Sequence, residues 1–211
     1  MTTSGRVFDA VLSDLDGVIR FYDMEQLEQL EAANGLPRGS TAETAFAPER
    51  DLPLMRGEIT KEQWIDSIAR GLADRVPWER GHALGTTLAE TKFRADDAVV
   101  GLLRQVRAAG VPVLLVTNAT PWLAEDLALL GLAGGPGDGV FDAVISSADL
   151  GVTKPDRRIY EVAAERAGAA PGRCLFVDDR EENVRAAEAL GMTGLLYREP
   201  ADLRRVLTPL L

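Results

Sequence analysis

Acidic residues stand in two tight groups, Asp14-Leu15-Asp16-Gly17 near the start of the chain and Asp178-Asp179 near its end. Two carboxylates two residues apart can approach one centre where the chain turns at a glycine, because glycine adopts backbone angles that other residues resist. Adjacent acids repel each other unless a cation or a donor lies between them. Carboxylate oxygens are ligands that Mg²⁺ prefers. We therefore predict a magnesium site at Asp14, Asp16, Asp178 and Asp179. For the second pair a structural alternative stays open, since acids that precede a helix are stabilised by its dipole.

Thr117-Asn118 and Lys154 could hold an anion beside such a cation. The hydroxyl and amide of Thr117 and Asn118, with free backbone N–H groups at the start of a helix expected from Trp122, have the parts of an anion cradle. Lys154 precedes Pro155, which restricts the local backbone and is expected to open the next helix. The alternative for Lys154 is an ordinary solvated loop lysine.

Each of these segments follows a short apolar run that predicts a buried strand. Helical patterns alternate with these runs, and such alternation predicts βαβ units, hence an α/β fold: a Rossmann-like parallel sheet with helices on both faces. Ligands bind beyond the carboxyl ends of the strands in sheets of this kind. The expected strands are 8–13, 111–116, 141–145, 174–177 and 194–197, and the expected helices are 96–109, 122–130, 157–167 and 181–190.

Residues 20–94 interrupt the alternation with helical patterns at 24–33, 61–71 and 81–89 and little that resembles a strand. We interpret this stretch as a small helical cap inserted into a core formed by residues 1–19 and 95–211. Arg20 and Tyr22 follow the first acidic group directly and are the nearest candidates for substrate contacts. Ordinary packing at the domain junction is the alternative for both.

The composition narrows the possible partners. A net charge of -10 disfavours binding to nucleic acid or to an anionic membrane face, although a small anion can still bind locally. No window approaches the roughly 18 consecutive apolar residues of a membrane span. The single cysteine, Cys174, lies in an apolar run and is expected to be buried, and the single histidine, His82, cannot supply a multi-histidine zinc site. We expect a cytoplasmic protein, either a monomer or a homodimer.

Taken in order, the motifs resemble a known family. Four segments closely resemble the ordered motifs of the haloacid dehalogenase superfamily. They are hydrophobic-Asp14-Leu-Asp16-Gly-Val, Val-Thr117-Asn118, Leu-Gly-Val-Thr-Lys154-Pro-Asp and Phe-Val-Asp178-Asp179-x-x-x-Asn183. The stretch Arg-Gly-Glu-Ile-Thr at 56–60 resembles a segment of the branch with a small helical cap. That branch includes sugar-phosphate phosphatases and the phosphatase domain of soluble epoxide hydrolases.

The resemblance implies a Mg²⁺-dependent phosphatase that acts on a small phosphorylated metabolite. Asp14 would attack phosphorus to give an aspartyl-phosphate, and Asp16 would protonate the leaving oxygen and later activate water. Mg²⁺ and Lys154 would neutralise the phosphate, while Thr117 and Asn118 would set its in-line position.

The resemblance also divides the metal ligands. Asp179 is expected to bind the metal directly, Asp178 to act through water or from a second layer, and Asn183 to orient this acidic loop. Because Asp16 has to hold or take a proton, we expect only its main-chain carbonyl to bind the metal and its side chain to stay free.

Proteins with three other functions could carry the same motifs: a dehalogenase, a phosphosugar mutase and a non-catalytic binding protein. The dehalogenases of the superfamily share the nucleophile but use no magnesium and lack an acid at the position of Asp16. A phosphosugar mutase would use the same core chemistry, and the short cap without a basic cluster favours hydrolysis over it. A non-catalytic binding protein would be expected to have lost some of these residues.

Overall fold

The computed structural model describes residues 5–134 and 139–211, which form two compact units. Met1–Phe21 and Arg94–Leu211 form the core unit, and Tyr22–Phe93 form the inserted unit. The division lies two residues after the expected first boundary at 19 and one residue before the expected return at 95.

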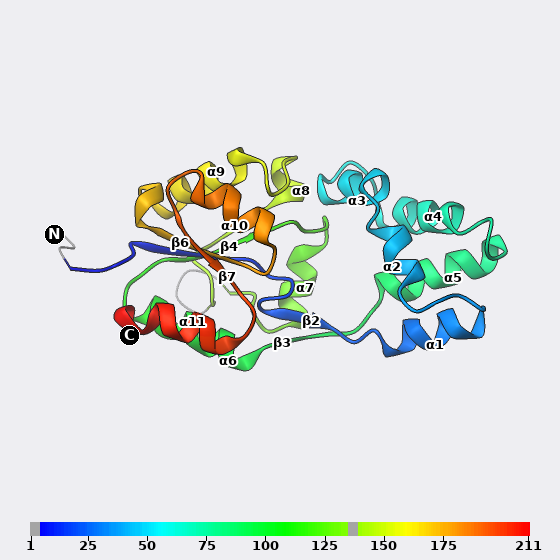
Figure 1. Ribbon diagram of the computed structural model, residues 1–211, viewed down its shortest axis with the longest axis horizontal. Coiled ribbons are helices and arrows are strands. Elements are labelled where there is room, and N and C mark those ends of the chain that lie inside the picture. The colour runs from blue at the N-terminus through cyan, green and yellow to red at the C-terminus, as the bar shows by residue number, and fades with distance from the viewer. Residues whose placement is uncertain (1–4, 135–138) are drawn as a thin grey trace. The chain divides into compact units, whose positions relative to one another are not determined.

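The core unit is built on one parallel sheet, which confirms the predicted α/β class (Figure 1). Its strand order is β5-β4-β1-β6-β7, and every neighbouring pair is parallel. The strands are β1 (Ala10–Ser13), β4 (Val113–Thr117), β5 (Ala143–Ser146), β6 (Cys174–Asp178) and β7 (Thr193–Leu196). Since β1 lies between β4 and β6, its carboxyl end has the ends of two other strands beside it.

Alternate residues of β1 enter two separate apolar layers, because successive side chains of a strand point to opposite faces. Val11 belongs to the layer that also contains Leu103 of α6, whereas Leu12 belongs to the layer that contains Tyr160 of α9. The helices of the core unit are α6 (Asp97–Ala108), α7 (Leu123–Leu129), α8 (Ser147–Leu150), α9 (Arg157–Ala167), α10 (Glu181–Glu188) and α11 (Pro200–Leu207). Short 3₁₀ turns lie at Pro171–Arg173 and Thr208–Leu210.

Aspartate side chains cap two of these helices. Asp96 accepts the N–H groups of Ala98 and Val99 at the start of α6, and Asp156 accepts that of Arg158 at the start of α9. Such caps satisfy backbone donors that have no partner within the helix. The expectation that Pro155 opens α9 is therefore wrong, because Asp156, the residue after the proline, caps this helix and Arg157 begins it.

The inserted unit is helical, as expected, but two more helices are present than the sequence pattern indicated. Its helices are α1 (Glu25–Ala33), α2 (Ser40–Ala45), α3 (Pro48–Met55), α4 (Lys61–Gly71) and α5 (Trp78–Ala89). Gly81 and Gly85 allow α5 to pack closely on α4, since a Cβ at these positions would lie 3.1 Å from Ala69 and 3.2 Å from Ile65. Thr60 and Gln63 form a capping box that begins α4.

Two short strands flank the inserted unit, in keeping with the expectation of little strand structure in residues 20–94. They are β2 (Arg20–Tyr22) and β3 (Phe93–Ala95), which pair with each other in a separate two-stranded sheet. Tyr22 and Phe93 meet edge to face, with ring centroids 5.9 Å apart. Three residues are too few for an alternating pattern to show in the sequence.

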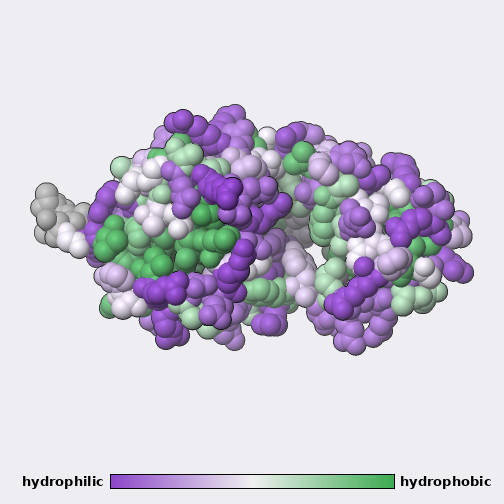
Figure 2. All heavy atoms as spheres, in the orientation of Figure 1, coloured by the Kyte–Doolittle hydropathy of each residue, from purple (hydrophilic) through white to green (hydrophobic). Residues whose placement is uncertain are grey.

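Hydrophilic residues cover most of the face drawn in Figure 2, in keeping with a chain in which 27% of the residues are charged. Among the described residues, no helix combines the length and the apolar character that crossing a membrane requires.

We predict that the Cys174 thiol does not react with a water-soluble disulfide reagent while the protein is folded. Its side chain is fully buried, and burial raises its pKa to about 11, so almost none of the reactive thiolate exists near neutral pH. Because the chain has one cysteine, the reaction measured with and without denaturant reports on this residue alone. Rapid modification of the native protein would contradict this packing of β6.

Candidate active site

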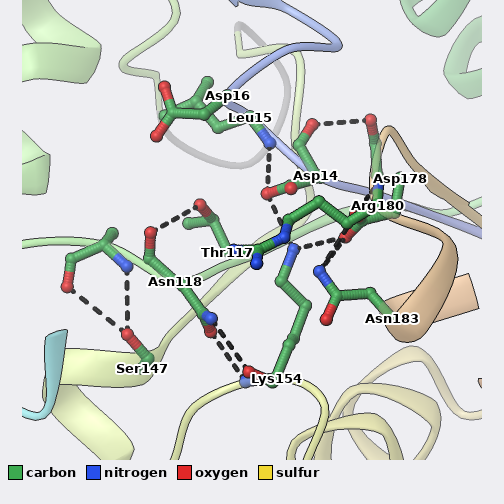
Figure 3. A network of polar contacts seen from close by, with 12 residues as sticks. Asp14, Leu15, Asp16, Thr117, Asn118, Ser147, Lys154, Asp178, Arg180 and Asn183 are labelled. Carbon is green, nitrogen blue, oxygen red and sulfur yellow. Dashed lines mark hydrogen bonds and ion pairs between the residues drawn. The ribbon is translucent and has the colours of Figure 1, made fainter. Parts of the chain in front are cut away.

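The candidate site lies where three neighbouring strands end. Asp14 follows β1 directly, Thr117 is the last residue of β4, and Asp178 is the last residue of β6. Parallel strands place their carboxyl ends at the same edge of the sheet, so residues distant in the sequence meet here. Figure 3 shows the resulting network of polar contacts.

Three carboxylates and one ammonium group form the centre of this network. One oxygen from each of Asp14, Asp178 and Asp179 lies within 4.8 Å of the others. Lys154 Nζ lies 2.8 Å from Asp14 Oδ1 and 2.7 Å from Asp178 Oδ2. The side chains of Lys154, Asp14 and Asp178 are only 1%, 8% and 0% exposed, so water screens their interactions weakly. The structure thus brings together four of the residues predicted from the sequence.

Gly17 makes room for the third carboxylate. Its φ is 74°, in the left-handed region that glycine adopts readily. A Cβ at this position would lie 2.2 Å from Asp179 Oδ2, so any larger residue here would force the Asp179 carboxylate to move. The turn after Asp14 therefore allows Asp179 to approach the cluster.

Burial and like charge act together on these groups. The pKa of Asp14 is raised to about 7: burial raises it most, Asp178 and Asp16 raise it as well, and Lys154 opposes them by lowering it. Burial and Asp178 likewise raise the pKa of Asp179. For Lys154 burial lowers the pKa, but Asp14 and Asp178 outweigh it and leave the pKa above its usual value. The cluster therefore keeps its lysine charged while resisting full ionisation of its acids.

The residues present fit a divalent cation. Three ionised carboxylates against one lysine leave a formal charge of −2 in a buried space, and the oxygens of Asp14, Asp178 and Asp179 are close enough to share one ion. A hard cation such as Mg²⁺ takes oxygen ligands of this kind. It would also offset the repulsion that raises the pKa of Asp14.

Asp178 is held by neighbours as well as by Lys154. Asn183 Nδ2 donates to both Asp178 oxygens at 3.0 and 3.1 Å, and the Arg180 N–H donates to Oδ1 at 2.9 Å. Tyr160 donates its hydroxyl to the Asn183 carbonyl, a contact that the sequence pattern did not indicate. Asn183 therefore lies where it orients the acidic loop.

Asn118 holds the backbone of Lys154. Its Oδ1 accepts the Lys154 N–H at 2.7 Å, and its Nδ2 donates to the Lys154 carbonyl at 3.0 Å. Both ends of the amide are thus engaged, which differs from the expected substrate contact. The buried Thr117 hydroxyl donates to the Asn118 carbonyl.

The anion cradle expected at the start of a helix stays a prediction, and two of its details differ from expectation. α7 begins at Leu123 rather than Trp122, and the Ala119 N–H donates to Ser147 Oγ at 3.0 Å. No sequence pattern marked Ser147, because its contact depends on how β5 and β4 pair.

Asp16 and Arg20 differ most from expectation. The Asp16 side chain lies outside the group of three carboxylates that could share a metal ion, as expected, but Arg20 binds it: Arg20 Nε and Nη2 donate to its two oxygens at 2.6 and 2.8 Å. Arg20 Nη1 donates to Asp126 Oδ2 of α7 at 2.6 Å. With 3% of its surface exposed and both ends of the guanidinium engaged, Arg20 is not presented to a substrate. Asp126 was missed because no pattern marked it among the acids of a surface helix.

Tyr22 belongs to the inserted unit and is 44% exposed, and its part in substrate binding stays a prediction.

Comparison with known proteins identifies the class to which this fold and site belong. The haloacid dehalogenase-like hydrolase family matches residues 8–191, and the chain therefore belongs to that family. The chain is similar to Sesquiterpene phosphatase astK of Aspergillus oryzae, with 35% identity over 54% of this chain and 58% of the relative. It is also similar to Phosphatase MT3486 of Mycobacterium tuberculosis, with 28% identity over 92% of this chain and 89% of the relative.

Some relatives are much longer than this chain. It spans 20% of the mouse Acyl-CoA dehydrogenase family member 10 and 37% of the rat Bifunctional epoxide hydrolase 2.

Solved structures share the fold. The HAD family enzyme bt-2542 of Bacteroides thetaiotaomicron superposes with a TM-score of 0.71 at 19% identity, covering 95% of this chain and 98% of that one. The same enzyme with magnesium and inorganic phosphate gives 0.65 at 21% identity, covering 90% and 94%. The L-2-Haloacid Dehalogenase RSc1362 gives 0.63 at 20% identity, covering 89% and 85%.

We predict that Lys154→Met lowers the free energy of unfolding of the metal-free protein by about 3–5 kcal/mol, the usual effect of removing one partner of a buried ion pair. The reason is that Asp14 and Asp178 would lose the cation between them. Urea unfolding measures the change. Lys92→Met, at an exposed lysine, is the control, and equal effects of the two substitutions would contradict the buried pairing.

Proposed function

We propose that the protein is a Mg²⁺-dependent phosphatase that hydrolyses a small phosphomonoester through an aspartyl-phosphate on Asp14. The observation that carries the proposal is the buried cluster in which Lys154 lies between Asp14 and Asp178, with Asp179 beside them. Family membership and the phosphatases among its relatives support it, as does a structural neighbour that contains magnesium and phosphate.

In the first step, one Asp14 oxygen attacks phosphorus and the bond from phosphorus to the ester oxygen breaks. Asp16 gives the leaving oxygen a proton, and the alcohol departs. In the second step, Asp16 takes a proton from water as that water attacks phosphorus, which releases inorganic phosphate and restores the Asp14 carboxylate. Lys154, whose Nζ lies 2.8 Å from Asp14 Oδ1, would stabilise the negative charge on the phosphoryl oxygens in both steps.

Asp14, Asp179 and the main-chain carbonyl of Asp16 would hold Mg²⁺ directly, with Asp178 acting through water or from a second layer, and the ion would supply positive charge to the phosphoryl oxygens when it is bound. Hydrogen bonds within the chain hold the charged groups of the site in place before substrate binds. Asn183 and the Arg180 N–H fix the Asp178 carboxylate, and Asn118 fixes the Lys154 backbone, so little has to reorganise when substrate arrives.

We predict that the protein releases inorganic phosphate from sugar phosphates, nucleotides or phosphoglycolate with Mg²⁺, and that a chelator abolishes the release. Asp14→Asn should lower turnover by on the order of 10⁶-fold, as removal of a nucleophile does elsewhere. The substitution removes a charge from a crowded acidic cluster, so the melting temperature should not fall. A phosphate-release assay with thermal melting measures both.

The same assay separates the other activities of this fold. Halide release from 2-chloropropionate without metal would favour a dehalogenase, and interconversion of hexose phosphates without phosphate release would favour a mutase. Full phosphatase activity of Asp14→Asn would contradict the proposed nucleophile.

We predict that stabilisation by Mg²⁺ grows as pH rises. The pKa of Asp14 in the metal-free folded protein is about 7 against an ordinary 3.8, so between these values the folded state holds a proton that the unfolded state has lost. The metal-free protein therefore loses stability as pH rises through this window. Mg²⁺ has to displace the proton, and the increase in melting temperature it causes should be larger at about pH 8 than at about pH 5.5. A pH-independent increase, or the same pH dependence in Asp14→Asn, would contradict this prediction.

A further inference from the structure

The Asp16 carboxylate is held outside the acidic cluster. It is not among the three carboxylates that lie within reach of a common ion, and Figure 3 shows its oxygens turned away from the Asp14 side chain. Arg20 binds both of its oxygens, at 2.6 and 2.8 Å. The backbones of Asp16 and Arg20 also form an isolated bridge, so this pairing is part of the turn after β1.

The two ends of this ion pair differ in their surroundings. The Asp16 side chain is 40% exposed, whereas that of Arg20 is 4% exposed. The Asp16 carboxylate can therefore leave Arg20 and turn into water or toward a ligand without becoming a buried, unpaired charge itself. Arg20 would be left as a buried cation, which is strongly unfavourable without a second partner. Asp126, with 13% of its side chain exposed, supplies that partner through a 2.6 Å contact to Nη1.

We propose that Arg20, anchored by Asp126, is a positioning residue that holds Asp16 outside the cluster in the resting protein and stays neutralised when Asp16 turns in to exchange a proton. This inference rests on the proposed phosphatase function, in which Asp16 has to reach an oxygen on the phosphorus bound to Asp14. Asp126 touches no reacting atom. Its effect passes through Arg20 to Asp16.

The test replaces Asp126 with asparagine, which keeps the shape of the side chain and removes its charge. Without that charge, release of Asp16 leaves Arg20 poorly compensated, so Asp16 should stay bound to it. Transfer of the phosphoryl group from an alkyl phosphate, measured in a single turnover, should slow about tenfold. The substrate concentration that gives half of the maximal rate should not change. Transfer from p-nitrophenyl phosphate should be unaffected, since its leaving group departs without a proton.

Two controls test whether the effect of Asp126 passes through Arg20 to Asp16. Glu125→Gln removes a neighbouring exposed charge from the same helix and should change neither rate. In an Asp16→Asn background, Asp126→Asn should have no further effect, because residues that act through one another are not additive. Equal slowing with both substrates, no slowing with either, or additivity with Asp16→Asn would overturn the inference.

A structure of the unchanged protein with Mg²⁺ and aluminium fluoride gives an independent readout. The contact between Arg20 and Asp126 should persist while Asp16 leaves Arg20. Asp16 still bound to Arg20 beside a bound fluoride would overturn the inference and leave the proposed phosphatase function intact. Absence of any phosphate release by the unchanged protein would instead overturn the proposed function, and this inference with it.

Discussion

The contact of one buried ammonium group with two buried carboxylates is the interaction on which the site depends. Lys154 Nζ lies 2.8 Å from Asp14 and 2.7 Å from Asp178, in surroundings where an unpaired charge would be strongly unfavourable. The sheet provides the two carboxylates because β1 and β6 are neighbours whose ends coincide. The lysine comes from the segment between α8 and α9, where Asn118 binds its backbone. The cluster thus joins three distant parts of the chain.

Two aspartates separated by one residue have been given opposite environments. Asp14 is buried among like charges beside a lysine, whereas Asp16 is part exposed and paired with Arg20. These environments suit the roles proposed for them, since a nucleophile has to be fixed and ionised, while an acid and base has to exchange protons with substrate and water. The turn at Gly17 contributes to this difference, since it lies between Asp16 and Arg20 and leaves room for Asp179.

The strand ends and their acids could be predicted from the sequence, because apolar runs that stop at polar residues mark buried strands that end at an active edge. Asp14, Lys154, Asp178 and Asp179 were found in this way. The partners of Asp16 could not, since the contact of Arg20 with Asp126 joins residues 106 positions apart and depends on how α7 packs. Asn118 was expected to contact substrate, and its hydrogen bonds to the Lys154 backbone depend equally on tertiary structure. The strands β2 and β3 have three residues each, too few for periodicity to reveal them.

The most direct test of this account is to ask where the phosphoryl group goes. The protein would be mixed with Mg²⁺ and a radiolabelled phosphomonoester that it hydrolyses, quenched in acid within one turnover, digested at low pH and analysed by mass spectrometry. The account predicts label on the peptide that contains Asp14 and none on that peptide from Asp14→Asn. Phosphate release without any labelled peptide, or label on another residue, would contradict the assignment of Asp14 as the nucleophile.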